Sequence, residues 1–204
     1  QGGIALVATN AGCVAAIDAF LGELRWVRRY ERIDPLRHRA RGKRRVDSDS
    51  MASQVDFAQG ELTSFLPNDL LIRDGFVLVA PCDGELLLCL DVGTGQLLWY
   101  VDASTHYAPY GRLTTLVGTS GEDVFALSQT HLVAIGLAGG LVKWAVELPT
   151  WNGNPLIGRG RGVVVGDHVV VPGQRELLVC HVSGQPGLRR LPLPTFGASR
   201  EPLP

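Results

Sequence analysis

The residues of this sequence that could carry chemistry are its carboxylates, thiols and imidazoles, and one dense run of guanidinium groups. Residues 28–45 contain nine lysines and arginines but only two acids, within a chain whose net charge is −1. Such a segment either binds anions or is a solvated insertion. Its densest part supplies our candidate contacts to a polyanion: Arg37, Arg39, Arg41, Lys43, Arg44 and Arg45.

Three kinds of polyanion could bind these cations through screened electrostatics: nucleic acid, anionic lipid and cell-wall polymer. Only Tyr30 interrupts the charge, so base stacking is poorly served and nucleic acid is disfavoured. The simpler interpretation, which we favour, is an insertion at about residues 28–60 between two structural units. No apolar run approaches the roughly 18 to 20 residues that would cross a bilayer, so we expect no transmembrane segment.

The cysteines and histidines show no spacing typical of a metal site, because neither CxxC nor HxxxH occurs. We therefore expect isolated histidines and no metal. Cys82 and Cys89 lie on neighbouring predicted strands, which raises the question of a disulfide. A two-residue turn at Asp83 and Gly84 would place Cys89 opposite Leu78, and this geometry disfavours the bond.

A repeated motif contains two further carboxylates. AxDxxxGxxxW occurs three times, once with cysteine for alanine and once with glycine for aspartate. Its residues are Ala16, Asp18, Gly22 and Trp26; Cys89, Asp91, Gly95 and Trp99; and Ala134, Gly140 and Trp144. A fourth version keeps only Cys180 and shifts by one residue to Gly187 and Leu191. The second and third tryptophans are about 45 residues apart, a period typical of propellers and solenoids.

Short strands separated by turn residues surround each motif. In the second repeat we predict four: LLIR, FVLVA, ELLLCLD and QLLWYV. The third and fourth repeats show the same four-stranded meander, whereas the first shows only three strands, so the sequence is expected to start inside a unit. We predict an all-β fold, a β-propeller of about four antiparallel blades with the first incomplete, in one domain over residues 1–204.

Each motif position has an expected structural role in this propeller. The glycines make the turn between the third and fourth strands, where a positive φ would penalise a β-carbon. The tryptophans lie on the outer strand and cover the seam between adjacent blades. The alanines and cysteines are small because a tryptophan packs over them.

The motif resembles the tryptophan-docking motif of quinoprotein-like propellers, a family that includes PQQ-dependent dehydrogenases and BamB-like outer-membrane assembly factors. Longer stretches, such as VLVAPCDGELLLCLDVGTGQLLW, are similar to large PQQ-binding-like repeat proteins of planctomycete-type bacteria. The resemblance implies a ring of seven or eight blades, of which this chain would form about half. It also implies a location in the periplasm or cell envelope.

A dehydrogenase of this family would require a carboxylate base, carboxylate and amide ligands for Ca²⁺ beside PQQ, and often adjacent cysteines. The sequence offers no such set, since no two cysteines are adjacent and turn amides are the expected partners of Asp18 and Asp91. We therefore expect no cofactor, and a non-enzymatic scaffold that presents loops or a central opening to a protein or envelope polymer. The alternative is a PQQ-dependent oxidoreductase whose cofactor residues lie outside these blades.

Overall fold

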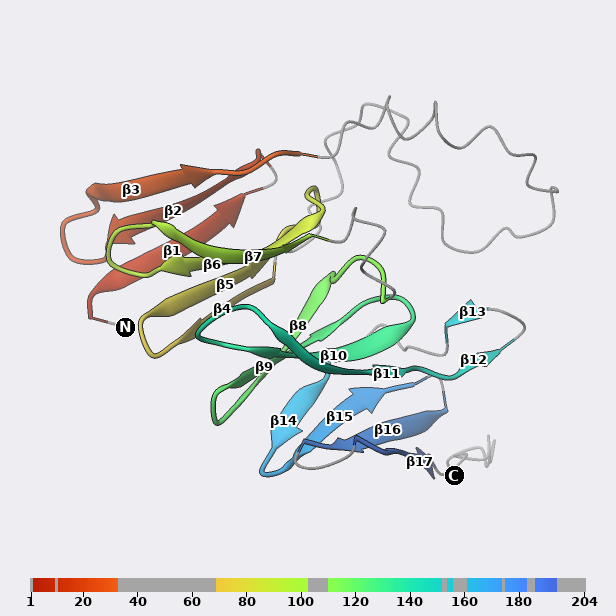
Figure 1. Ribbon diagram of the computed structural model, residues 1–204. Coiled ribbons are helices and arrows are strands. Elements are labelled where there is room, and N and C mark those ends of the chain that lie inside the picture. Colours follow the sequence, from red (N-terminus) through yellow and green to blue (C-terminus); the bar gives the residue numbers. More distant parts are fainter. Residues whose placement is uncertain are drawn as a thin grey trace, which may run out of the picture. The chain divides into compact units, whose positions relative to one another are not determined.

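The computed structural model describes residues 2–9, 11–32, 69–102, 110–151, 154–155, 161–173, 175–182 and 186–193. All regular structure within these ranges is β-strand (Figure 1). The strands form one three-stranded sheet, three four-stranded sheets and a two-stranded hairpin, and every pairing is antiparallel. The prediction of an all-β fold built from propeller blades, the first with three strands, is confirmed.

The chain divides into two compact units, Gln1–Ser104 and Thr105–Pro204. The first unit holds two sheets, which we call blade 1 and blade 2. Blade 1 consists of β1 (Ile4–Thr9), β2 (Cys13–Asp18) and β3 (Leu24–Arg29). Blade 2 consists of β4 (Asp69–Arg73), β5 (Phe76–Ala80), β6 (Leu86–Asp91) and β7 (Leu97–Asp102).

The second unit holds blades 3 and 4 and a short hairpin. Blade 3 consists of β8 (Thr115–Ser120), β9 (Asp123–Leu127), β10 (His131–Gly136) and β11 (Val142–Glu147). The hairpin is β12 (Thr150–Trp151) and β13 (Asn154–Pro155). Blade 4 consists of β14 (Val163–Val165), β15 (His168–Pro172), β16 (Glu176–His181) and β17 (Leu188–Pro192). Every strand predicted from the repeats is present, with ends that differ by a few residues.

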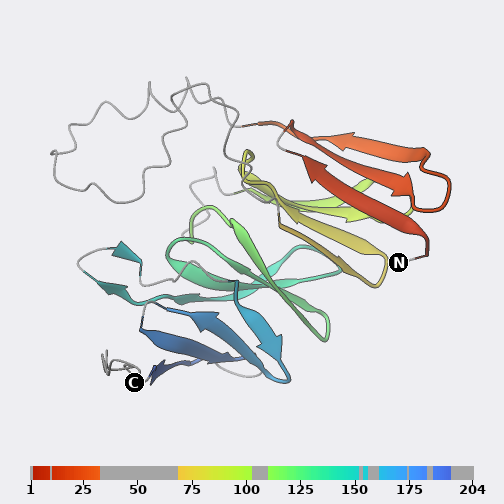
Figure 2. The ribbon, with the colours of Figure 1, turned by 180° about the vertical axis from the view of Figure 1, so that it is seen from behind.

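In each blade the spatial order of the strands follows their order in the chain, as expected for a meander (Figures 1 and 2). The turns within each blade are short, and a short hairpin turn can join only strands that lie next to each other in the sheet. Blades 1 and 2 pack through a cluster centred on Val14, Val77, Val79, Leu88 and Leu90. Burial alternates along β2, so blade 1 has one well-covered face, which is the face toward blade 2.

The second unit has its own hydrophobic cluster. Phe125, Leu132 and Ala134 of blade 3 pack with residues of blade 4, chiefly Leu178 and Cys180. Burial raises the pKa of the Cys180 thiol, and the same cause raises that of Cys89 in blade 2 to about 12. Both thiols are buried and therefore act as small apolar side chains rather than as reactive groups.

Candidate functional site at the repeat motif

A β-bulge recurs at the same place in blades 1, 2 and 3. The tryptophan of each motif lies directly opposite the small residue, in the pairs Ala16–Trp26, Cys89–Trp99 and Ala134–Trp144. The register then shifts, so that one residue of the outer strand has no partner. The bulged residues are Arg25, Leu98 and Lys143. Because a bulge bends a strand and redirects its side chains, this shift helps to set the direction in which the tryptophan points.

Trp26 docks on blade 2 through both the edge and the face of its ring. Its Nε1 donates a hydrogen bond of 3.0 Å to the carbonyl oxygen of Val92. A β-carbon on Gly95 would lie only 2.5 Å from two carbons of the indole. Gly95 also has a φ of 70°, a conformation that L side chains rarely adopt. The motif glycine therefore makes the turn and also leaves room for the indole of the neighbouring blade.

The motif aspartate holds the turn that the indole contacts. Asp91 Oδ1 accepts bonds from the amides of Gly93 (3.0 Å) and Thr94 (2.8 Å) and from the Thr94 hydroxyl (2.8 Å). The bonds from Thr94 and Gly93 lower the pKa of Asp91. The amide of Gly95 donates to the Asp91 carbonyl at 2.8 Å, which closes the turn. This carboxylate stays ionised and already accepts three bonds, so its role is structural.

Asp18 holds the corresponding turn of blade 1 and bonds in addition to the bulged arginine. Its Oδ1 accepts from the amides of Phe20 (2.9 Å) and Leu21 (3.0 Å), and its Oδ2 accepts from Arg25 at 2.6 Å. The Arg25 bond, followed by the two amide bonds, lowers the pKa of Asp18 to about 2. A carboxylate with so low a pKa is a poor general base near neutral pH.

Blade 3 has Gly136 where the motif has aspartate, yet the backbone of its turn is the same. The Gly136 amide donates to the Leu141 carbonyl and the Gly140 amide donates to the Gly136 carbonyl, both at 2.8 Å. The bulged residue, Lys143, forms an ion pair with Asp123, which lies opposite Gly136 on β9. The carboxylate that bonds the bulged cation has therefore moved to the adjacent strand. Sequence reasoning missed this exchange because Asp123 lies outside the motif.

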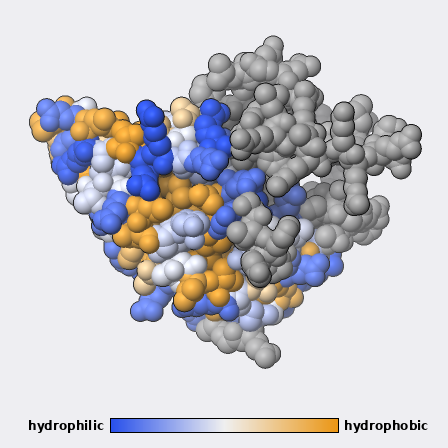
Figure 3. All heavy atoms as spheres, turned by 45° about the horizontal axis from the view of Figure 1, so that its top comes forward, coloured by the Kyte–Doolittle hydropathy of each residue, from blue (hydrophilic) through white to orange (hydrophobic). Residues whose placement is uncertain are grey.

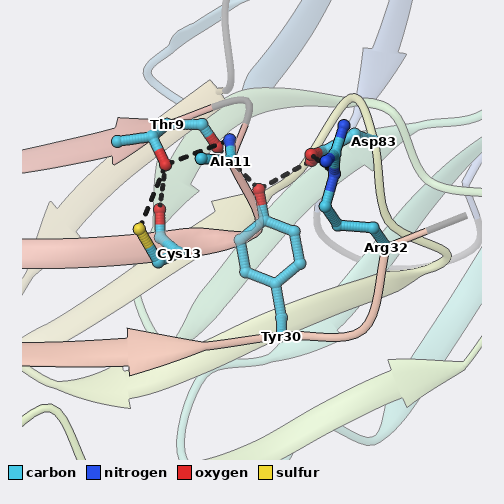
Figure 4. Close-up of polar contacts among 6 residues, drawn as sticks. All are labelled: Thr9, Ala11, Cys13, Tyr30, Arg32 and Asp83. Carbon is cyan, nitrogen blue, oxygen red and sulfur yellow. Dashed lines mark hydrogen bonds and ion pairs between the residues drawn. The ribbon is translucent and has the colours of Figure 1, made fainter.

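A second polar cluster joins the end of blade 1 to the β5–β6 turn of blade 2 (Figure 4). The hydroxyl of Tyr30 lies 2.6 Å from Asp83 Oδ1 and 2.9 Å from the carbonyl oxygen of Thr9. Arg32 Nε donates to Asp83 Oδ2 at 2.8 Å. Burial, followed by the bond to Asp83, raises the pKa of Tyr30 well above its usual range. The sequence offers no signal for this contact between distant residues.

Blade 4 departs from the other three, as the sequence suggested. Its β16–β17 pairing has no register shift, and Leu188 rather than Leu191 lies opposite Cys180. The fourth blade therefore lacks the bulge as well as the aspartate and the tryptophan. On its β15–β16 pair, His168 and His181 face each other with ring centroids 4.8 Å apart. The sequence analysis predicted isolated histidines, so this contact is a difference from the prediction. The hairpin register brings the two rings together, and the spacing of the residues in the sequence does not show it.

Four further features were considered in the sequence: the basic run, possible metal ligands, the cysteines and possible membrane spans. The basic residues between Arg37 and Arg45 lie outside the described residues. Within the part of the chain that is described, no group of three or more histidines, cysteines, aspartates and glutamates could hold a metal ion. None of the four cysteines, which all lie among the described residues, forms a disulfide bond, and Cys89 lies opposite Leu78 as predicted. No helix among the described residues is long and apolar enough to cross a membrane.

A family profile described as outer membrane protein assembly factor BamB matches residues 1–195 of the sequence. The chain belongs to this BamB-like family. No curated protein matches the BamB-like chain in sequence. The planctomycete-type resemblance thus stays a prediction, whereas the BamB-like resemblance is confirmed.

Two solved structures show the same fold as the BamB-like chain. BamB from Moraxella catarrhalis is 17% identical with a TM-score of 0.56, and the match covers 89% of this chain and 47% of that one. The dihydro-heme d1 dehydrogenase NirN in complex with DHE is 13% identical with a TM-score of 0.58, covering 94% of this chain and 35% of that one. The BamB-like chain thus spans about half the length of the BamB structure that it matches.

Proposed function

We propose that this chain is a non-enzymatic scaffold module of a bacterial envelope, which presents its loops or central opening to a protein or envelope-polymer partner. The observation that supports the proposal is that the polar groups of the repeat motif already form hydrogen bonds that hold the turns and the blades together. Trp26 bonds to blade 2, and the carboxylates of Asp18 and Asp91 accept bonds from turn amides. The family description, which names an outer-membrane assembly factor, supports the envelope location and a protein partner.

The carboxylates of the repeat motif do not fit a PQQ site. Ca²⁺ beside the cofactor requires carboxylate oxygens that are free to coordinate it. The motif carboxylates of Asp18 and Asp91 each accept several hydrogen bonds from their own turn or from Arg25. A cation bound to the Oδ1 atom of either residue would therefore compete with the hydrogen bonds that hold its turn. We propose accordingly that the blades described here bind no PQQ.

Titration of the purified chain with PQQ and Ca²⁺ tests the cofactor part of this proposal. Cofactor absorbance and protein fluorescence are followed while dye-linked alcohol oxidation is read in parallel. We expect neither saturable binding nor turnover at high micromolar cofactor. Stoichiometric binding with turnover would overturn the proposal in favour of a quinoprotein oxidoreductase.

Affinity capture from envelope extracts tests the scaffold part. The wild-type chain is compared with variants whose blade-connecting turns are shortened one at a time. We expect a specific partner that at least one of these variants fails to retain. Retention of every specific partner by all of the variants would contradict presentation through the loops.

A further inference from the structure

Blade 4 carries a histidine at the place where blades 1 and 2 carry the motif aspartate. In blades 2 and 3, the residue after the aspartate position donates its amide hydrogen to the turn between the first two strands, at 2.8 Å in both. In blade 4 the donor of this bond is Val182, and the acceptor is the Asp167 carbonyl at 2.9 Å. His181, the residue before Val182, therefore occupies the aspartate position of the backbone. The sequence motif does not show this, because its spacing is lost in blade 4.

A second histidine lies directly opposite this one. His168 on β15 pairs with His181 on β16. The neighbouring pair, Asp167 and Val182, shares a backbone hydrogen bond, so the two histidines form a non-hydrogen-bonded pair, the class in which opposite side chains come closest. Both side chains are exposed, and their ring centroids are 4.8 Å apart. The hairpin therefore holds two imidazoles at one point that solvent can reach.

The separation of the two rings fits two imidazoles that bind one metal ion. Bonds of about 2.0 to 2.1 Å from Zn²⁺ to nitrogen place each ring centroid roughly 3.2 Å from the metal. An angle of about 90 to 109° between the two bonds then separates the centroids by roughly 4.5 to 5.2 Å. The observed 4.8 Å lies within this range. Rotation about the side-chain bonds is enough to aim one nitrogen of each ring at a shared ion.

The corresponding corners of blades 1 and 3 hold ion pairs and stay open to solvent. Asp18 pairs with Arg25 in blade 1, and Asp123 pairs with Lys143 in blade 3. Another blade packs on the same face of each, yet the Arg25 and Lys143 side chains are 42% and 47% exposed. Figure 3 shows hydrophilic atoms, in blue, at the surface over blade 1 at its upper left. Access to this corner therefore does not depend on whether a further sheet covers the blade.

The groups around the histidine pair decide which ion suits it. Asp167 precedes His168 in the turn, and Arg189 lies opposite Val179 on the strand next to His181. Among the described residues no third histidine, cysteine or carboxylate completes a metal-binding group, so water fills the other coordination positions. Two neutral nitrogen donors with water suit a divalent ion of the first transition series, and Cu²⁺ binds such donors most tightly.

We propose that His168 and His181 form a binding site for a divalent transition-metal ion, with Cu²⁺ preferred and water completing its coordination. The ion joins β15 to β16 at the corner where ion pairs join the strands of blades 1 and 3. It binds the neutral imidazoles, so protons compete with it. This inference goes beyond the proposed scaffold function and does not depend on it.

Isothermal titration calorimetry of the full chain without an affinity tag tests the site. Cu²⁺ is supplied as its glycine complex near neutral pH, and Ni²⁺ is titrated separately because thiols do not reduce it. We expect one ion per chain at this site, with Cu²⁺ bound more tightly than Ni²⁺. Electron paramagnetic resonance of the bound Cu²⁺ should show two nitrogen donors.

Two variants and a matched control locate the site. His168→Gln and His181→Gln should each weaken binding at least about tenfold, because one imidazole alone loses the second anchor. Both side chains are exposed, so glutamine leaves the core intact. His131→Gln changes a blade 3 histidine that lies opposite Glu147, and it should bind both ions as the wild type does. Excess Ni²⁺ should raise the unfolding temperature of wild type and His131→Gln only, and a chelator should reverse the shift.

Three outcomes would overturn the inference. One is the absence of saturable binding of either ion by the wild type. Another is binding that neither His168→Gln nor His181→Gln weakens, because the ion would then lie elsewhere on the chain. The third is a loss caused by only one of the two variants, together with a single nitrogen donor in the spectrum, because one imidazole would then hold the ion without the other.

Discussion

The indole of Trp26 occupies the space that a β-carbon on Gly95 would need, with ring carbons 2.5 Å from that position. The two residues belong to consecutive repeats, and each holds a fixed place in the same motif. The joint between blades 1 and 2 therefore consists of one residue that protrudes and one that has no side chain.

Comparison of Gly95→Ala with Gly22→Ala isolates the contact with the indole. Both glycines have the same positive φ, so alanine should cost about 1 kcal/mol of unfolding free energy at either position. Only Gly95→Ala also collides with Trp26, which should add roughly 1 to 3 kcal/mol. Urea unfolding of the two variants measures the difference. Equal destabilisation would show that the turn conformation alone requires glycine.

Shortening Trp26 separates its hydrogen bond from its packing. Trp26→Phe leaves the Val92 carbonyl without its donor and should destabilise the chain by about 1 kcal/mol. Trp26→Ala also removes the ring from the cluster between the blades and should cost about 2 to 4 kcal/mol. Thermal unfolding monitored by circular dichroism gives both values. A loss below about 0.5 kcal/mol for Trp26→Ala would contradict the docking role.

The carboxylate of Asp18 makes stability depend on pH in a defined window. Its pKa falls from 3.8 to about 2 on folding, so its contribution is complete above about pH 4 and is lost as the pH falls toward 2. Asp18→Asn should therefore lower the urea midpoint much more at pH 7 than at pH 2, where about half of the folded-state carboxyls are protonated. Glu23→Gln, an exposed carboxyl in the same turn, is the control. A constant difference at every pH would contradict the assignment.

The phenol of Tyr30 should stay protonated while ordinary tyrosines ionise. Because its pKa lies above the usual value of 10.0, the absorbance change at about 295 nm near pH 10 should be the same in wild type and Tyr30→Phe. The neutral phenol also contributes stability that is complete below pH 10 and declines above it, since the unfolded state ionises first. If Tyr30→Phe instead lowers the amplitude of the absorbance change near pH 10, Tyr30 ionises with the ordinary tyrosines and the buried bond to Asp83 is not formed.

Much of the fold was predictable because its signals are local. Glycine turns and short apolar runs located the strands of all four blades, and the small residues at Ala16, Cys89 and Ala134 lie opposite their tryptophans. The bulge was not predictable, because one extra residue in the outer strand does not change the pattern of apolar and polar residues enough to be recognised in the sequence. The β12–β13 hairpin was missed because each strand has two residues, too few to show alternation.

Contacts between residues that only the tertiary fold brings together could not be predicted from the sequence. Tyr30 and Asp83 belong to different blades, and no spacing rule relates them. Lys143 pairs with Asp123, a residue that supplies the carboxylate missing from Gly136 only because β9 and β10 are adjacent.

The recurring bulge has a consequence for how such proteins grow. Blades 1, 2 and 3 each carry a motif tryptophan and a motif glycine, and the tryptophan of blade 1 is seated on the glycine of blade 2, so this joint is directional. Because nothing in such a joint limits the number of units, gene duplication can add or remove a repeat without inventing a new interface. Blade 4 has neither the bulge nor the tryptophan, so a unit added after it could not use this joint.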